Sequence, residues 1–60
     1  MNITAAAAEY LAGFDNPAAI AAIAERGTSE YDDYILEVAY GGDWPAVALE
    51  IQRLARNQGE

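Results

Sequence analysis

The chain has 60 residues, and its ten acidic and three basic side chains give a formal net charge of −7. It contains no Cys, His or Lys, which excludes disulfides, thiolate metal sites and histidine-based catalysis. The acidic balance also argues against direct binding to nucleic acid or to an anionic membrane, because both require a basic surface.

The alanine-rich N-terminal half predicts two short helices. The first spans about residues 4–13, with Asn2 or Thr4 as its cap and four consecutive alanines as strong helix formers. The second covers about residues 17–26, where Asn16 is a good N-cap and the proline that follows suits the first helical position.

The C-terminal half predicts two further helices. Ser29 and Asp32 have the spacing of a capping box before the third helix, and a Gly-Gly pair at 41–42 ends it. Asp43 is the expected cap of the fourth helix, and residues 57–60 are expected to fray. The fourth helix carries an apolar stripe at helical spacing, formed by Trp44, Val47, Ala48, Ile51, Leu54 and Ala55.

These patterns predict an all-α fold, a compact bundle of about four short helices that forms a single domain over residues 1–60. The core is expected to contain the isoleucines together with Tyr10, Phe14 and Trp44. The core face of the third helix is expected near Tyr31, Ile35 and Val38.

The placement of the acids is the most informative feature, because no basic residue lies between Arg26 and Arg53. Three carboxylates of the third helix are expected opposite its core face at i, i+3 and i+7, namely Glu30, Asp33 and Glu37. Neighbours in such a stripe are roughly 5–6 Å apart, a spacing that resembles that of phosphates along a nucleic-acid strand. The candidate partner-binding residues are therefore Glu30, Asp32, Asp33, Glu37, Tyr40 and Asp43.

Two simpler explanations compete with this interpretation. Acids in the first turn of a helix stabilise its dipole without any partner, and a charged outer face is normal for a soluble helix. The absence of bases for i, i+4 pairing favours a functional role. Leu49 is expected on the outer face of the fourth helix with Arg53 and Arg56, where it either covers a helix seam or marks a second contact surface.

Nothing in the sequence indicates catalysis, so we expect no enzyme, no metal and no cofactor. The pair Asp32-Asp33 lacks the pattern of a calcium loop, and Ser29 has no His or Lys to activate it. No targeting signal is visible and no apolar run approaches the ~20 residues that span a bilayer. The sequence predicts a cytoplasmic protein.

About half of the chain resembles a known group of small, acidic, Cys-free phage proteins, the anti-CRISPR proteins of type I, with type I-C as one candidate subtype. The similarity lies in an acidic region and the helix that follows it, Tyr31-Asp32-Asp33-Tyr34 through Ala39-Tyr40-Gly41, then Pro45, Ile51 and Ala55.

The resemblance implies an inhibitor that mimics DNA with a carboxylate surface, binds a Cascade subunit and blocks recognition of target DNA and its protospacer-adjacent motif. It also implies that the protein acts in the cytoplasm of a bacterial host cell. The charge alone indicates a basic protein surface as partner, bound by a monomer or a weak homodimer. The alternatives are a small acidic regulatory or antitoxin-like subunit that binds a protein through an apolar face, and a structural module that needs no partner.

Overall fold

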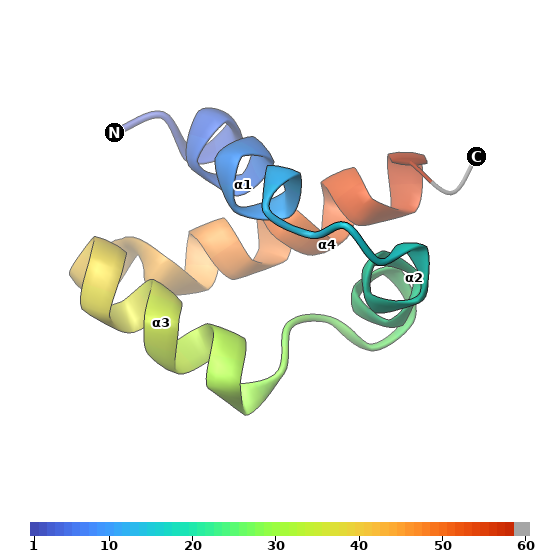
Figure 1. Cartoon of the computed structure of the whole chain (residues 1–60). Helices are drawn as coiled ribbons and strands as arrows, with labels where there is room; N and C mark the ends of the chain where they lie inside the picture. Colours follow the sequence, from blue (N-terminus) through green and yellow to red (C-terminus); the bar gives the residue numbers. More distant parts are fainter. Residues whose placement is uncertain (59–60) are drawn as a thin grey trace.

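The computed structural model describes residues 1–58 and places most of them in helices, with no strand in that range (Figure 1). The elements are α1 (Ile3–Ala12), α2 (Pro17–Arg26), α3 (Glu30–Tyr40), the 3₁₀ turn η1 (Gly41–Asp43) and α4 (Trp44–Gln58). The predicted all-α class is confirmed. Each helix in the described range is too short or too polar to cross a membrane.

The first two helices begin at the residues that the sequence indicates. Asn2 Oδ1 accepts a hydrogen bond from the Ala5 amide at 2.9 Å, and Asn16 Oδ1 accepts one from the Ala18 amide at 2.9 Å. Pro17 occupies the first turn of α2. Each cap satisfies a backbone donor that the helix itself leaves unpaired, typically worth about 1 kcal/mol.

The predicted capping box at the start of α3 is confirmed. Ser29 Oγ accepts from the Asp32 amide at 3.1 Å, and Asp32 Oδ2 accepts from the Ser29 amide at 3.2 Å. The helix ends at Gly41, whose φ of +60° is accessible to glycine at little cost.

The junction between α3 and α4 differs from the prediction. Asp43 belongs to η1, which leads directly into Trp44, so there is no separate cap position and Asp43 does not cap α4. The last helix continues through Asn57 to Gln58, past the point where fraying was expected to begin. Residues 59–60 lie outside the described range.

Helix α4 is the central element of the fold. Helices α1, α2 and α3 each pack against it. Figure 1 shows α1 and α3 on either side of α4, with α2 near its C-terminal end. The buried residues of α4 follow the expected i, i+4, i+8 spacing, namely Val47, Ile51 and Ala55.

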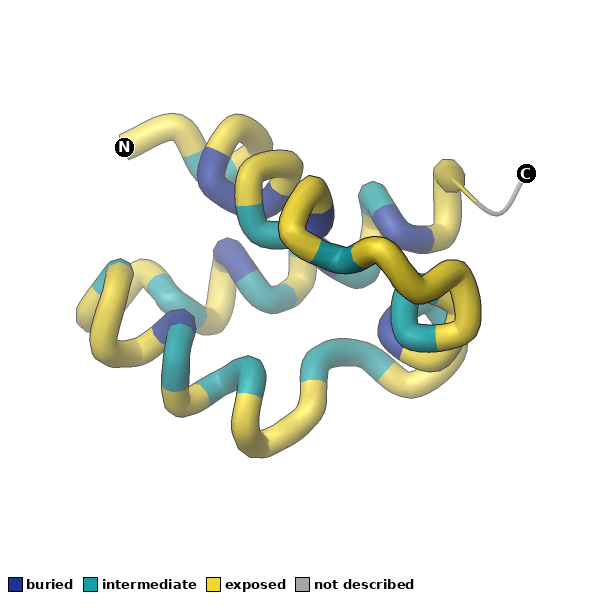
Figure 2. The backbone as a smooth tube through the Cα atoms, viewed as in Figure 1, coloured by how far each residue is buried: buried dark blue, intermediate teal, exposed yellow. Residues whose placement is uncertain are grey.

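The buried residues at the centre of the core carry small or aliphatic side chains. Figure 2 marks the buried positions along the backbone. Of the residues expected in the core, Ile23 and Ile51 are buried, whereas Tyr10, Phe14 and Trp44 are half-buried and pack against the buried centre. Alanines let three helices approach α4 closely, which leaves the larger rings at the edge. The buried residues are Ala6, Ala7, Leu11, Ile23, Leu36, Val47, Ile51 and Ala55.

The orientation of α3 also corrects the prediction. Leu36 is fully buried, whereas Tyr31 and Val38 are 74% and 71% exposed, so the helix is turned by roughly 130° from the expected core face. The side that faces α1 carries Asp32, whose carboxylate accepts a hydrogen bond from the Tyr10 hydroxyl. Because that partner compensates the half-buried acid, the acidic side of α3 can pack inward.

A side chain of α4 holds the end of α2. The carbonyl oxygen of Ala24 accepts a hydrogen bond from Arg56 Nε at 2.9 Å. Gly27 then turns the chain toward α3 with a φ of +86°. One of the C-terminal carbonyls of α2 is thereby satisfied by the helix on which α2 packs.

Candidate functional site

Three large side chains of α3 project into solvent. Tyr31, Tyr34 and Val38 are 74%, 67% and 71% exposed, and their i, i+3, i+7 spacing places them on one strip of the helix. Single exposed apolar residues are ordinary, but a contiguous strip is typical of an interaction site.

Two carboxylates lie beside this strip. Glu30 and Glu37 are exposed and sit about 40–60° around the helix from Tyr34. The single ion pair within residues 1–58 joins two other residues, and no hydrogen bond engages either of these side chains in that range. We term the five residues the outer face of α3, namely Glu30, Tyr31, Tyr34, Glu37 and Val38.

Asp32 points the other way and is part of the fold. The Tyr10 hydroxyl donates to its Oδ1 at 2.5 Å and Ser29 Oγ donates to its Oδ2 at 2.8 Å. Burial acts to raise the pKa of the Asp32 carboxyl, but these hydrogen bonds outweigh it and the pKa lies below its usual value. Burial and the same contact raise the pKa of the Tyr10 hydroxyl. The capping interpretation of Asp32 is therefore confirmed.

The other predicted site residues are divided between interior and surface. Asp33 is half-buried, and its Oδ1 accepts from Thr28 Oγ1 at 2.5 Å. Tyr40 is half-buried against the core, while Asp43 is exposed in η1. Of the expected carboxylate stripe, only the first and last members are thus fully exposed, and they lie beside the apolar strip rather than opposite the core.

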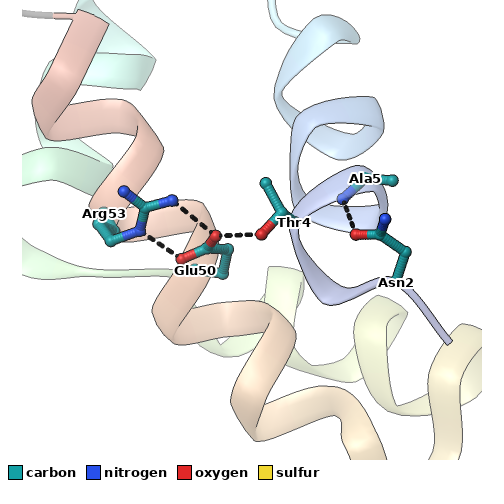
Figure 3. A network of polar contacts seen from close by, with 5 residues as sticks. All are labelled: Asn2, Thr4, Ala5, Glu50 and Arg53. Carbon is teal, nitrogen blue, oxygen red and sulfur yellow. Dashed lines mark hydrogen bonds and ion pairs between the residues drawn. The ribbon is translucent and has the colours of Figure 1, made fainter.

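Glu50, the last acid of the base-free stretch, connects α1 with α4 (Figure 3). Its carboxylate accepts from Thr4 Oγ1 at 2.6 Å, from Arg53 Nε at 2.5 Å and from Arg53 Nη2 at 2.8 Å. The hydrogen bonds from Arg53 and then Thr4 lower the pKa of Glu50 from 4.5 to about 2. This is the one ion pair among residues 1–58, and it involves no residue of α3.

Two sequence features with possible chemical roles can be located in the described part of the chain. No cluster of three or more potential metal-ligating side chains occurs within residues 1–58. The Ser29 hydroxyl is occupied by the capping box with Asp32. Glu30 and Glu37, by contrast, are exposed carboxylates that no ion pair in that range engages.

Two further surface features lie away from the outer face of α3. An open, mostly apolar hollow of about 720 Å³ lies between α2 and the C-terminal part of α4 and is lined by Pro17, Ile20 and Ala55, among others. Leu49, which is 70% exposed, lies outside this lining and projects from α4 as the sequence predicts. These features are the structural basis for the alternative apolar interface.

Sequence reasoning misplaced the apolar part of the outer face of α3. Tyr31 and Val38 were expected in the core. The signal that could have found them is Leu36, a large aliphatic side chain that the expected core stripe leaves on the outside. A stripe through Leu36 and Tyr40 places Tyr31, Tyr34 and Val38 in solvent.

A scan against protein-family models, a search of curated proteins and a search of solved structures found no match to this chain. A function for the protein therefore has to be argued from its own residues.

Proposed function

We propose that the protein is a stoichiometric inhibitor that uses the outer face of α3 to bind a basic surface with which another protein reads DNA. The sequence resemblance makes a type I Cascade complex the first partner to test, with blocked recognition of target DNA as the consequence. The observation that carries the proposal is the exposed strip of Tyr31, Tyr34 and Val38, bordered by unpaired carboxylates in a stretch without any base.

The two kinds of side chain have complementary roles in such a contact. Aromatic residues supply large buried area and are common among the residues that dominate binding energy. Carboxylates steer the encounter and compete with phosphates for Lys and Arg side chains. Glu30 and Glu37 are about 10.5 Å apart along the helix axis, so they reach basic groups at two positions of a phosphate-binding surface.

The test is competition with DNA. Purified type I-C Cascade is incubated with a labelled target duplex and increasing amounts of the protein, and displacement of the duplex is measured. The double variant Glu30→Lys, Glu37→Lys should be a weaker inhibitor by roughly tenfold or more. Its helical circular dichroism should remain, because both positions are exposed.

A matched control carries the same change in charge elsewhere. Asp15→Lys with Glu25→Lys alters two exposed acids on the α2 side and should leave inhibition nearly intact at moderate salt. Equal loss in both double variants would mean that only net charge matters. Failure of the unaltered protein to displace DNA from several type I complexes would overturn the choice of partner.

The alternative function, an acidic regulatory or antitoxin-like subunit, is favoured by Leu49 and the apolar hollow between α2 and α4. Such a contact would persist at high salt, since it depends on apolar burial. The variant Leu49→Glu would weaken such an apolar contact. The same variant should leave binding through the outer face of α3 unchanged.

A further inference from the structure

A groove of about 460 Å³ lies between α1 and α3, next to the outer face of α3. Both helices contribute aromatic side chains to its walls. Each helix also contributes one acidic residue, Glu9 from α1 and Asp32 from α3. The two surfaces are continuous, because Tyr31 belongs to the outer face and also lines the groove. The residues that matter for its chemistry are Glu9, Tyr10, Phe14, Tyr31, Asp32 and Tyr40.

The aromatic walls are held in place. The rings of Tyr10 and Phe14 form an edge-to-face pair with centroids 5.4 Å apart and planes at 88°. The hydrogen bond from the Tyr10 hydroxyl to Asp32 joins α1 to α3 across the groove. The site is thus organised before any ligand arrives, which reduces the entropy lost on binding.

The charge of the groove is one-sided. Glu9 is exposed and Asp32 holds a carboxylate at the wall, whereas no basic residue lines the groove. Arg26 lines a neighbouring hollow that shares Asp32, but it forms no ion pair within residues 1–58. An aromatic groove that carries two carboxylates and no basic residue is complementary to an organic cation.

We propose that this groove binds an arginine side chain of the protein partner. A planar guanidinium stacks on aromatic rings and directs several donors at once toward carboxylates, whereas an ammonium group acts as a compact, strongly hydrated charge. The inference rests on the proposed function, since it names the side chain that the basic partner would place beside the outer face of α3.

The test uses short peptides, so it does not depend on any particular partner. The ¹⁵N-labelled protein is titrated with acetyl-Gly-Arg-Gly-amide, with the lysine peptide and with the neutral citrulline isostere, and amide shifts are followed by NMR. The arginine peptide should bind most tightly and the citrulline peptide least. The largest shifts should fall on the groove residues of α1 and α3 and spare Leu49 on α4.

Two pairs of variants distinguish binding in the groove from binding to the neighbouring acidic and aromatic residues of α3. Glu9→Gln and Tyr31→Ala should each weaken the arginine peptide by about two- to fivefold. The controls Glu37→Gln and Tyr34→Ala change the same residue types on α3 outside the groove and should have little effect. All four positions are exposed, so the variants should fold.

Two results would overturn the inference. One is equal binding of the citrulline and arginine peptides, because the groove would then not select a cation. The other is a set of shifts spread evenly over all exposed acids, or an equal loss with Glu37→Gln and Glu9→Gln. Failure of the protein to displace DNA from Cascade would instead count against the proposed function and leave the peptide result intact.

Discussion

The acids of the base-free stretch have distinct environments, although the sequence presents them as one group. Asp32 and Glu50 each accept a hydrogen bond from a hydroxyl of α1, and each pKa is lowered. Glu30 and Glu37 face water instead. The first pair stabilises contacts between helices, and the second pair is available to a partner.

The hydrogen bonds of Glu50 predict that its contribution to the stability of the fold depends on pH. Its pKa of about 2 in the fold lies below the ordinary 4.5, so the ionised carboxylate favours the folded state above the ordinary value. That contribution is lost as the pH falls from 4.5 toward 2. The unaltered protein should therefore be more stable than Glu50→Gln at pH 7, and the difference should shrink through this window. Urea unfolding at several pH values measures it.

Thr4→Val is the companion variant for this measurement. It keeps the carboxylate of Glu50 but removes the hydroxyl donor from α1, so it should reproduce part of the loss at neutral pH. If the difference between the unaltered protein and Glu50→Gln stayed constant down to low pH, the contact with Thr4 and Arg53 would not be what stabilises the ionised group.

At the scale of the helices, the positions of their ends are the part that local chemistry predicts well. Asn2, Asn16 and Ser29 each cap a helix as expected, because a cap depends on residues within one turn. The stripe of α4 was predictable for a related reason, since its apolar residues admit only one inward face.

The orientation of α3 could not be predicted from periodicity, because two stripes of this helix are apolar. One contains Tyr31 and Val38, and the other contains Leu36 and Tyr40. The choice depends on Tyr10, which lies 22 positions away from Asp32 and donates the hydrogen bond that lets the acidic side face inward. The error carried over to the candidate site, whose acids were expected opposite the core and whose apolar residues were expected inside it.

The orientation of α3 makes a direct prediction about stability. Leu36→Ala should lower the free energy of unfolding by about 2–5 kcal/mol, since it opens a cavity at a fully buried position. A 60-residue domain is stable by roughly 3–9 kcal/mol in total, so this variant should be marginal or unfolded. Val38→Ala, at a position that is 71% exposed, should cost less than about 0.5 kcal/mol. Urea titrations of both variants measure the two values.

These two variants also test the arrangement that creates the outer face. The core face expected from the sequence alone reverses their order, with Val38 inside and Leu36 outside. If Val38→Ala lowered the free energy of unfolding more than Leu36→Ala did, α3 would have the orientation expected from the sequence alone. The apolar strip would then not lie on the surface.

For the whole molecule, small size and high net charge both work against stability. A domain of this length buries only about 60% of the surface that its unfolded chain exposes. A net charge of −7 adds repulsion that one ion pair among residues 1–58 does little to offset. The acids that we assign to binding contribute to that repulsion. Where the helix dipole does not compensate this repulsion, the acid is expected to cost stability, and substituting it should reveal the cost.

Glu37 is the clearest case for this last prediction. It lies four residues after Asp33, where like charges repel, and toward the C-terminal end of α3, where a negative charge opposes the helix dipole. Relieving one such repulsion is worth roughly 0.2–0.5 kcal/mol, which in a domain this small raises Tm by roughly 1–4 °C. Glu37→Gln should thus melt higher than the unaltered protein in low salt while it inhibits more weakly.

Glu30→Gln is the matched control, because it removes the same charge from the first turn of α3, where a carboxylate favours the helix dipole. It should inhibit more weakly without the gain in Tm. Salt screens the repulsion between exposed charges, whose range is about 10 Å at 0.1 M salt and shorter at higher concentrations. The gain in Tm of Glu37→Gln should therefore shrink in concentrated sodium chloride. A gain that is independent of salt, or equal in both variants, would show that repulsion along α3 is not its origin, and the proposed opposition between binding and stability would fail.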